Sequence, residues 1–242
     1  YFDSKVGHIV QTLEECGQLD NTIVIVTADH GDMLGERSLW YKMNFFEGSA
    51  RVPLMVAAPS MSAGLVTEAV STLDVCPTLC DLAGVSMADV MPWTDGESLV
   101  GLSDGRHRES PVRMEYAAEA SYAPLVGLRS GKYKHIRCAL DPDMLFDLEA
   151  DPHERTNLAQ DPAHAATAAA LRAQSEALWD LSRFDAAVRE SQARRWVVYE
   201  ALRNGAYFPW DYQPLQKASE RYMRNHMDLN ILETSKRFPR GE

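Results

Sequence analysis

The segment that most restricts the fold is a continuous apolar run, Thr-Ile-Val-Ile-Val-Thr, at residues 22–27. A run this rich in β-branched residues is typical of a strand covered on both faces, as in a parallel sheet. Apolar residues recur at helical spacing before it, and Gly17 stands where a C′ glycine closes a helix. A helix followed by a buried strand predicts an α/β architecture. Because this helix begins almost at Tyr1, we expect the chain to be the C-terminal portion of a longer protein.

The whole chain divides into three predicted regions, residues 1–110, 111–203 and 204–242. The first continues with a buried strand at 54–57, a helix around 73–82 closed by Gly84, and a loop at 85–110. The second has strand-like runs at 111–115, 125–129, 132–137 and 144–148, with a turn at Ser130-Gly131, then helices within 162–203. We expect a small antiparallel sheet there. The third, from Asn204, is predicted to be an extended arm rich in aromatic residues.

Composition narrows the class of partner. The formal charge of −11 argues against nucleic acid and anionic membranes, and it suits a cationic small substrate. No stretch of 18 uncharged apolar residues occurs, so no membrane span is predicted. The spacing of the four cysteines fits neither a zinc module nor a dense disulfide framework. We therefore expect free thiols in a reducing, cytoplasmic compartment.

A carboxylate and an imidazole follow the first predicted strand directly, in Asp29-His30-Gly31. Ligands of open α/β sheets sit beyond the carboxyl ends of strands, and Gly31 lets the backbone turn sharply there. The pair could hold a divalent metal, although imidazole is not a usual calcium ligand, so calcium, magnesium and manganese stay open. The alternative is a plain turn in which Asp29 is a cap.

A single lysine, Lys42, lies twelve residues after His30, between Tyr41 and Met43. Its ammonium could neutralise a sulfate or phosphate group. The alternative is that its stem covers apolar surface.

Together these features resemble the sulfatase family of the alkaline phosphatase superfamily. The family pattern is matched by Asp29-His30-Gly31, by Lys42, and by Glu47 through Arg51-Val52-Pro53. The similarity continues through STLDVCPTLCDLAG, GLRSGKYKHIR and LFDLEADPHERTNLA. Within the family, LWYKMNFFEGSARVPLMV and the tail ASERYMRNHMDLNILETSKRFPR are similar to the choline sulfatases.

The resemblance implies an alkaline-phosphatase-like sandwich, of which this chain supplies the C-terminal part of the central mixed sheet with flanking helices. A small antiparallel-sheet subdomain and an extended tail follow. It also implies that Asp29 and His30 bind one divalent metal ion, with calcium preferred and magnesium or manganese as alternatives. Lys42 binds the sulfate, and Lys42 and His30 are the catalytic residues of this part. Glu47 and Arg51 are expected to form a structural ion pair.

Sulfatases use a formylglycine made from a cysteine in Cys-x-Pro-Ser-Arg. None of the four cysteines has that context. We therefore expect the nucleophile in an N-terminal portion, and expect this chain to be inactive by itself.

The choline branch implies choline sulfate as the substrate. Its quaternary ammonium is held by aromatic faces and carboxylates. Glu115, Tyr116, Glu119 and Tyr122 form a cluster of that composition, with Glu119 as the preferred contact, and a solvated loop is the alternative. The tail is expected to assemble a dimer or tetramer and to bring Asp228 to a substrate. Two other functions stay open: another hydrolase of the superfamily, acting on aryl sulfates, phosphonates or phosphate esters, or a non-catalytic assembly module.

Overall fold

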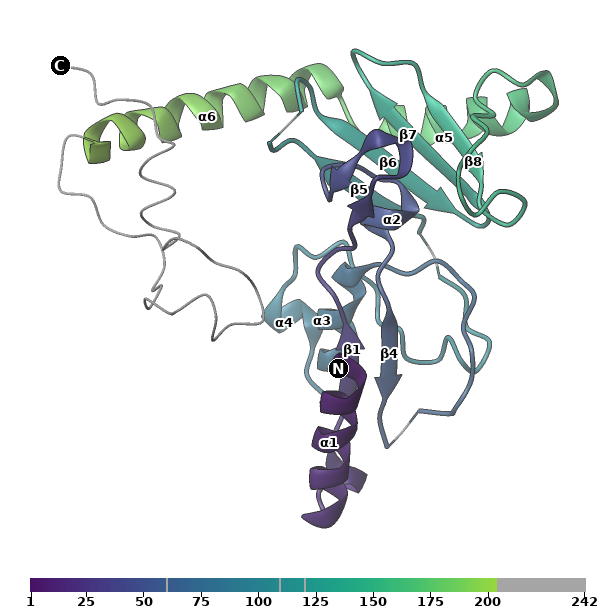
Figure 1. Cartoon of the computed structure of the whole chain (residues 1–242), viewed down its shortest axis with the longest axis vertical. Helices are drawn as coiled ribbons and strands as arrows, with labels where there is room; N and C mark the ends of the chain where they lie inside the picture. The colour runs from purple at the N-terminus through teal and green to yellow at the C-terminus, as the bar shows by residue number, and fades with distance from the viewer. Residues whose placement is uncertain (60, 109, 120, 204–242) are drawn as a thin grey trace. The chain divides into compact units, whose positions relative to one another are not determined.

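The computed structural model describes residues 1–59, 61–108, 110–119 and 121–203 (Figure 1). Its helices are α1 Phe2–Glu15, α2 Glu47–Ala50, α3 Val75–Leu82, α4 Met87–Val90, α5 Ala165–Leu178 and α6 Leu181–Arg203. Its strands are β1 Val24–Thr27, β2 Met33–Leu34, β3 Trp40–Tyr41, β4 Leu54–Ala57, β5 Val112–Tyr116, β6 Leu125–Ser130, β7 Tyr133–Cys138 and β8 Met144–Asp147. No helix in these ranges is both long and apolar enough to cross a membrane.

Helix α1 ends as its sequence predicts. Gly17 has a φ of 64°, and its N–H donates to the carbonyl of Glu14. The next N–H, of Gln18, donates to the carbonyl of Leu13. This pair of hydrogen bonds is the Schellman motif. The motif needs a residue in the left-handed region and so favours glycine.

The prediction of a parallel, fully covered first strand is wrong for the described residues. Strand β1 pairs antiparallel with β4, with Ile25 opposite Val56, in a two-stranded sheet. Its residues are half-buried or exposed. The apolar run does identify a strand, but composition does not say which strand pairs with it. No segment within the described ranges hydrogen-bonds to its other edge.

A four-stranded antiparallel sheet in the order β5-β6-β7-β8 organises the second predicted region. Its existence confirms the prediction of a small antiparallel sheet there. The hairpin between β6 and β7 is shifted by one residue from the predicted turn: Ser130 pairs with Tyr133, so Gly131 and Lys132 form the loop. Gly131 has a φ of 52°, a left-handed conformation that suits a two-residue hairpin.

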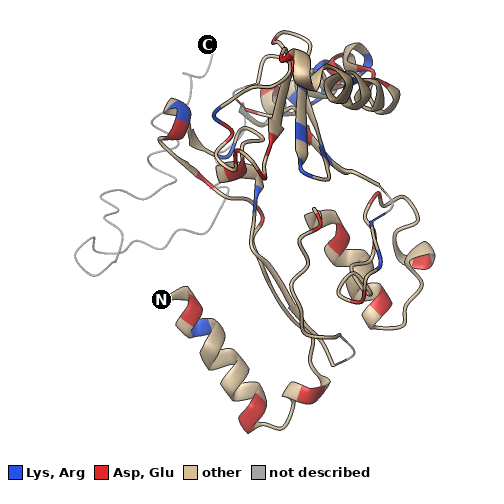
Figure 2. Ribbon diagram, turned by 90° about the vertical axis from the view of Figure 1, so that its right-hand side faces the viewer, with Lys and Arg blue, Asp and Glu red and all other residues tan. Residues whose placement is uncertain are grey.

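Alternating residues of this sheet build two different cores. Val126 and Leu128 pack against Trp179 and Leu181 on the face that carries α5. Ile136 and Phe146 pack against Phe45 on the other face, next to α2 (Figure 1). Basic and acidic residues are interspersed around the sheet (Figure 2). The sheet therefore holds the segment that follows Lys42 on one face and α5 on the other.

A buried carboxylate organises residues 85–110, which were predicted to be a loop and contain the short helix α4. Asp74 is fully buried, forms an ion pair with Arg108 and accepts a hydrogen bond from the N–H of Glu97. It also completes a capping box with Ser71 at the start of a 3-10 turn, Thr72–Asp74, that leads into α3. The loop is thus fixed to the helix that precedes it.

The chain divides into two compact units, Tyr1–Asp185 and Ala186–Glu242. The predicted pair of helices within 162–203 is confirmed as α5 and α6. In the part of α6 that belongs to the second unit, Trp196 and Tyr199 stack with ring centroids 5.0 Å apart. The predicted arm from residue 204, with Asp228, lies outside the described residues.

Candidate functional site

The predicted metal pair lies immediately beyond strand β1. The Asp29 carboxylate is 85% exposed, and its Oδ1 accepts a hydrogen bond from the N–H of His30. Its Oδ2 lies 3.3 Å from His30 Nε2, and the imidazole is 32% exposed. The two side chains therefore converge on one partly open point.

A hydrogen bond to the backbone orients the ring of His30. Its Nδ1 lies 2.8 Å from the carbonyl oxygen of Gly31. A carbonyl oxygen can only accept, so Nδ1 donates, and in the neutral imidazole Nε2 then has a lone pair. That lone pair faces the Asp29 carboxylate, and two electron-rich groups so close together suit a cation between or beside them.

A cation from the chain itself lies at this point. Lys42 Nζ is 3.2 Å from His30 Nε2, within hydrogen-bond distance. Lys42 follows β3, the second strand of a short hairpin in which Met33 pairs with Tyr41. The structure thus brings together Asp29, His30 and Lys42, although the lysine is twelve residues from the histidine. The alternative prediction, in which the stem of Lys42 only covers apolar surface, does not account for this contact of its ammonium.

The turn after His30 depends on the absence of a side chain at Gly31. A Cβ atom there would lie 2.2 Å from the carbonyl oxygen of Gly48, a backbone atom. The N–H of Gly31 donates to the carbonyl of Ser49 at 2.8 Å. The Asp-His-Gly segment is therefore packed closely against α2.

Helix α2 is anchored by buried ionic groups. Lys134 on β7 is 1% exposed, and its Nζ lies 2.7 Å from Glu47 Oε1 and 2.6 Å from Glu154 Oε1. It also donates to the carbonyl of Phe45 at 2.7 Å. The expected ion pair of Glu47 with Arg51 is replaced by this one, because strand β7 places Lys134 under the start of α2. Lys134 and Glu154 were not predicted from the sequence, since neither stands near the Asp-His-Gly motif in the chain.

The predicted ammonium cluster is divided between the two faces of the sheet. Glu115 Oε1 accepts a hydrogen bond from Trp179 Nε1 at 2.6 Å, on the face that carries α5. Tyr116, its neighbour in the strand, belongs to the apolar cluster around Phe45. Its hydroxyl donates to the backbone carbonyl of Glu119 at 2.7 Å, and burial raises the pKa of that hydroxyl. Glu119 is thus tied to the face on which the segment after Lys42 lies.

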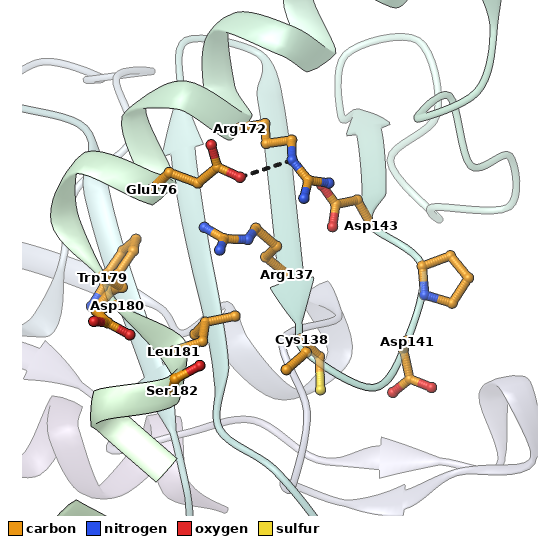
Figure 3. Close-up of a pocket in the computed structure, with 12 residues that line it drawn as sticks. Arg137, Cys138, Asp141, Asp143, Arg172, Glu176, Trp179, Asp180, Leu181 and Ser182 are labelled. Carbon is orange, nitrogen blue, oxygen red and sulfur yellow. Dashed lines mark hydrogen bonds and ion pairs between the residues drawn. The ribbon is translucent and has the colours of Figure 1, made fainter. Parts of the chain in front are cut away.

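A separate hollow of about 680 Å³ lies between the end of β7 and the α5–α6 junction (Figure 3). Arg172 there contacts Asp143 and Glu176, each at 3.0 Å. Because Arg137 bonds to Ser175 of α5, this hollow is on the face opposite α2. It is not part of the Asp29–Lys42 cluster.

The chemistry of the cluster fits part of a metal site. One carboxylate oxygen and one imidazole nitrogen are available from Asp29 and His30, and both are ligands of divalent metals. Within the described ranges, no group of three or more His, Cys, Asp and Glu side chains is arranged to hold an ion. Any further ligands have to come from other residues.

Family models match most of the chain. A model described as "N-sulphoglucosamine sulphohydrolase, C-terminal" matches residues 35–180. A model described as "Choline sulfatase enzyme C terminal" matches residues 186–238.

Individual relatives agree with these models. The Choline-sulfatase of Rhizobium meliloti (strain 1021) is 65% identical over 245 aligned positions, which are 100% of this chain and 48% of that protein. Arylsulfatase K of Mus musculus is 36% identical over 65% of the chain and 30% of its own length. The chain spans less than half the length of these curated relatives.

Solved structures share the fold. A putative sulfatase from Bacteroides thetaiotaomicron has a TM-score of 0.62 at 30% identity, over 72% of this chain and 39% of its own. The phosphonate monoester hydrolase of Agrobacterium radiobacter has a TM-score of 0.61 at 29% identity, over 73% and 38%.

Proposed function

The chain belongs to the sulfatase family, whose solved members have the alkaline-phosphatase-like fold, and on that premise we propose that it carries the C-terminal part of an enzyme that hydrolyses choline O-sulfate to choline and sulfate. The observation that carries the proposal is that two groups approach His30 Nε2. Asp29 Oδ2 lies 3.3 Å from it and Lys42 Nζ lies 3.2 Å from it. A cation-binding pair next to an ammonium suits an anionic group such as the sulfate of an ester.

The proposed role of Lys42 is to bind the sulfate and to neutralise charge as the S–O bond of the ester breaks. A lysine ammonium has three donors, so it can contact more than one sulfate oxygen. Preorganised positive charge at the point where negative charge develops is a large contribution to catalysis. Lys42 Nζ lies 3.2 Å from His30 Nε2, and because that nitrogen has one lone pair, a metal ion bound to it would leave the donors of the ammonium to the sulfate.

Asp29 and His30 are proposed to bind one divalent metal, with calcium first and magnesium or manganese as alternatives. When bound, the ion would polarise a sulfate oxygen and orient the nucleophile. The chain's own contribution is the oriented imidazole ring of His30 and the exposed carboxylate of Asp29.

A formylglycine nucleophile is assigned to residues other than these 242, because none of the four cysteines stands in the Cys-x-Pro-Ser-Arg context. In this proposal the residues described above bind and orient the ester, and the nucleophile attacks its sulfur. The chain alone would then be inactive.

The choline end is proposed to contact Glu119. A quaternary ammonium donates no ordinary hydrogen bond and is stabilised by carboxylates and aromatic faces. The tether from Tyr116 to the Glu119 carbonyl supports this assignment, since it fixes the residue on the sheet face next to α2. Asp228 is proposed as a second contact, supplied by the tail of a neighbouring subunit in a dimer or tetramer. A cytoplasmic location is proposed because all four cysteines are free.

The test is a comparison of substrates with the full-length protein. Choline sulfate, 4-nitrophenyl sulfate and a phosphonate monoester are assayed at matched concentrations, and the metal content is measured on the same preparation. We expect the highest kcat/KM for choline sulfate. A preference for the aryl ester would remove the choline assignment, and a preference for the phosphonate would place the chain with the phosphonate hydrolases of the same fold.

A further inference from the structure

The loop that carries Lys42 has little regular structure of its own. Strands β2 and β3 have two residues each, and Arg37, Ser38 and Tyr41 all have positive φ values. A two-residue hairpin ladder does not hold a side chain in place. The position of the Lys42 ammonium has to come from contacts with another part of the molecule.

One buried side chain makes the contact. Ser49 of α2 is 2% exposed, and its hydroxyl donates to the backbone carbonyl of Lys42 at 2.6 Å. The carbonyl of Ser49 accepts from the N–H of Gly31, the residue after His30, at 2.8 Å. A single residue therefore bonds to the lysine segment through its side chain and to the histidine segment through its backbone.

The helix that carries Ser49 is fixed from outside. A helix of four residues is not stable alone. At the N-terminal end of α2, Lys134 donates hydrogen bonds to the carbonyl of Phe45 and the carboxylate of Glu47. Glu154 Oε2 accepts a hydrogen bond from the N–H of Glu47 at 2.8 Å. The ammonium and the Glu154 carboxylate are both nearly fully buried, so neither ion can move into water without breaking the pair. The position of Ser49 is thus set by the sheet.

We propose that Ser49 is a positioning residue of the active site: its hydroxyl holds the backbone of Lys42 so that the Lys42 ammonium lies beside His30, where it contacts the sulfate. The inference rests on the proposed role of Lys42 in the site. It adds that the serine acts through the lysine and not through the general stability of the fold.

The experiment is a double-mutant cycle in the full-length protein, with Ser49→Ala, Lys42→Ala and the double variant. Substitution of Ser49 by Ala leaves its backbone carbonyl in place, so the bond from Gly31 is kept and only the tether to Lys42 is lost. Misplacement of a reacting group costs up to about 100-fold. We expect Ser49→Ala to lower kcat/KM roughly 10- to 100-fold when Lys42 is present, and less than about twofold when Lys42 is already Ala.

A matched control is Ser175→Ala. Ser175 is also buried, at 1% exposed, and its hydroxyl bonds to Arg137 on the opposite face of the sheet. This variant should keep kcat/KM within about twofold of wild type. Ser49→Cys, which keeps the size and weakens the donor, replaces Ser49→Ala if the alanine variant does not fold.

Both choline sulfate and 4-nitrophenyl sulfate are used as substrates, so that two failures can be told apart. If only the aryl ester is hydrolysed, the choline proposal fails and the cycle on the aryl ester still tests Ser49. Equal losses from Ser49→Ala in both backgrounds, or no loss in either, would overturn the positioning role alone. No loss from Lys42→Ala on either ester would overturn the role of the lysine and this inference with it.

Discussion

The Nζ of Lys42 lies 3.2 Å from the Nε2 of His30, the nitrogen whose lone pair is left free by the bond from Nδ1 to the Gly31 carbonyl. The contact joins a residue that follows β3 to one that follows β1. It puts the ammonium beside the proposed metal pair, with N–H donors available for a substrate.

Replacement of Lys42 by Ala should therefore abolish most of the sulfate-ester hydrolysis of the full-length protein. Loss of one preorganised donor at an oxyanion costs roughly 100- to 1000-fold in kcat. Steady-state kinetics on choline sulfate measure the effect. Lys5→Ala, which changes an exposed lysine of α1, is the matched control and should leave kcat unchanged. Turnover by Lys42→Ala near the wild-type rate would mean that the ammonium does not contact the reacting sulfate.

Replacement of Asp29 by Asn should lower metal content. The amide keeps the size of the carboxylate and removes its charge, which strengthens the binding of a hard divalent cation. Substitution of a residue that only hydrogen-bonds to a metal ligand already changes metal affinity about 10- to 100-fold. The loss of a direct ligand should therefore weaken metal binding by at least about tenfold. Metal analysis after dialysis against a limiting chelator gives the stoichiometry. Asp32→Asn, at an exposed carboxylate of the same loop, should retain wild-type metal content; equal retention by both variants would remove Asp29 from the site.

Local sequence signals predicted the elements, and tertiary contacts explain what they did not predict. The glycine after α1 and the apolar run of β4 are short-range signals, and both elements lie where the sequence places them. The apolar run of β1 was expected to belong to a parallel sheet, and its pairing with β4 is antiparallel, because an apolar run does not encode strand direction. The ion pair of Lys134 with Glu47 joins residues 87 positions apart, so no spacing rule could find it. Its lysine stands in an ordinary strand pattern, and only its 1% exposure distinguishes it.

The candidate site shows the same division. Asp29, His30 and Lys42 were predicted from their motif, and the structure brings them together. Ser49 was not predicted, since a serine in a short helix carries no signal of its own. The role of each residue in chemistry, and everything assigned to Asp228, stays a prediction.

Replacement of Gly31 by Ala should destabilise the protein. The new Cβ would lie 2.2 Å from the Gly48 carbonyl oxygen, so the backbone of one segment has to shift. Overpacking of this kind costs about 1–3 kcal/mol. Gly7→Ala is the control, because a Cβ at Gly7 in α1 meets nothing within 4 Å and should stabilise the helix by roughly 0.5–1 kcal/mol. Chemical unfolding measures the free energy of unfolding of both variants. A change of the same sign in both variants would contradict the close approach at Gly31.

His135 should make stability depend on pH below neutrality. Burial lowers the pKa of His135, against the opposing effect of Asp143, whose Oδ2 lies 3.1 Å from Nε2. The unfolded histidine, with a pKa of about 6.5, then binds more protons than the folded one. This contribution is complete above about pH 6.5 and is lost as the pH falls below it. His135→Gln keeps a donor for Asp143 and cannot titrate, so its unfolding free energy should fall less between pH 7.5 and 5.5. Parallel pH profiles for the two proteins would show that His135 does not titrate on unfolding.

Replacement of Glu119 by Gln tests the choline end separately from the sulfate end. The side chain of Glu119 is exposed and its backbone is held by Tyr116, so the substitution should not disturb the fold. Removal of the carboxylate removes one attraction for the quaternary ammonium, and we expect the KM for choline sulfate to rise by roughly tenfold. An aryl sulfate carries no cation, so its KM should stay within about twofold and serves as the internal control. Glu149→Gln, at another exposed glutamate, should change neither value. A loss on both esters would instead place Glu119 near the sulfate, and no loss on either would return the residues after β5 to a solvated loop.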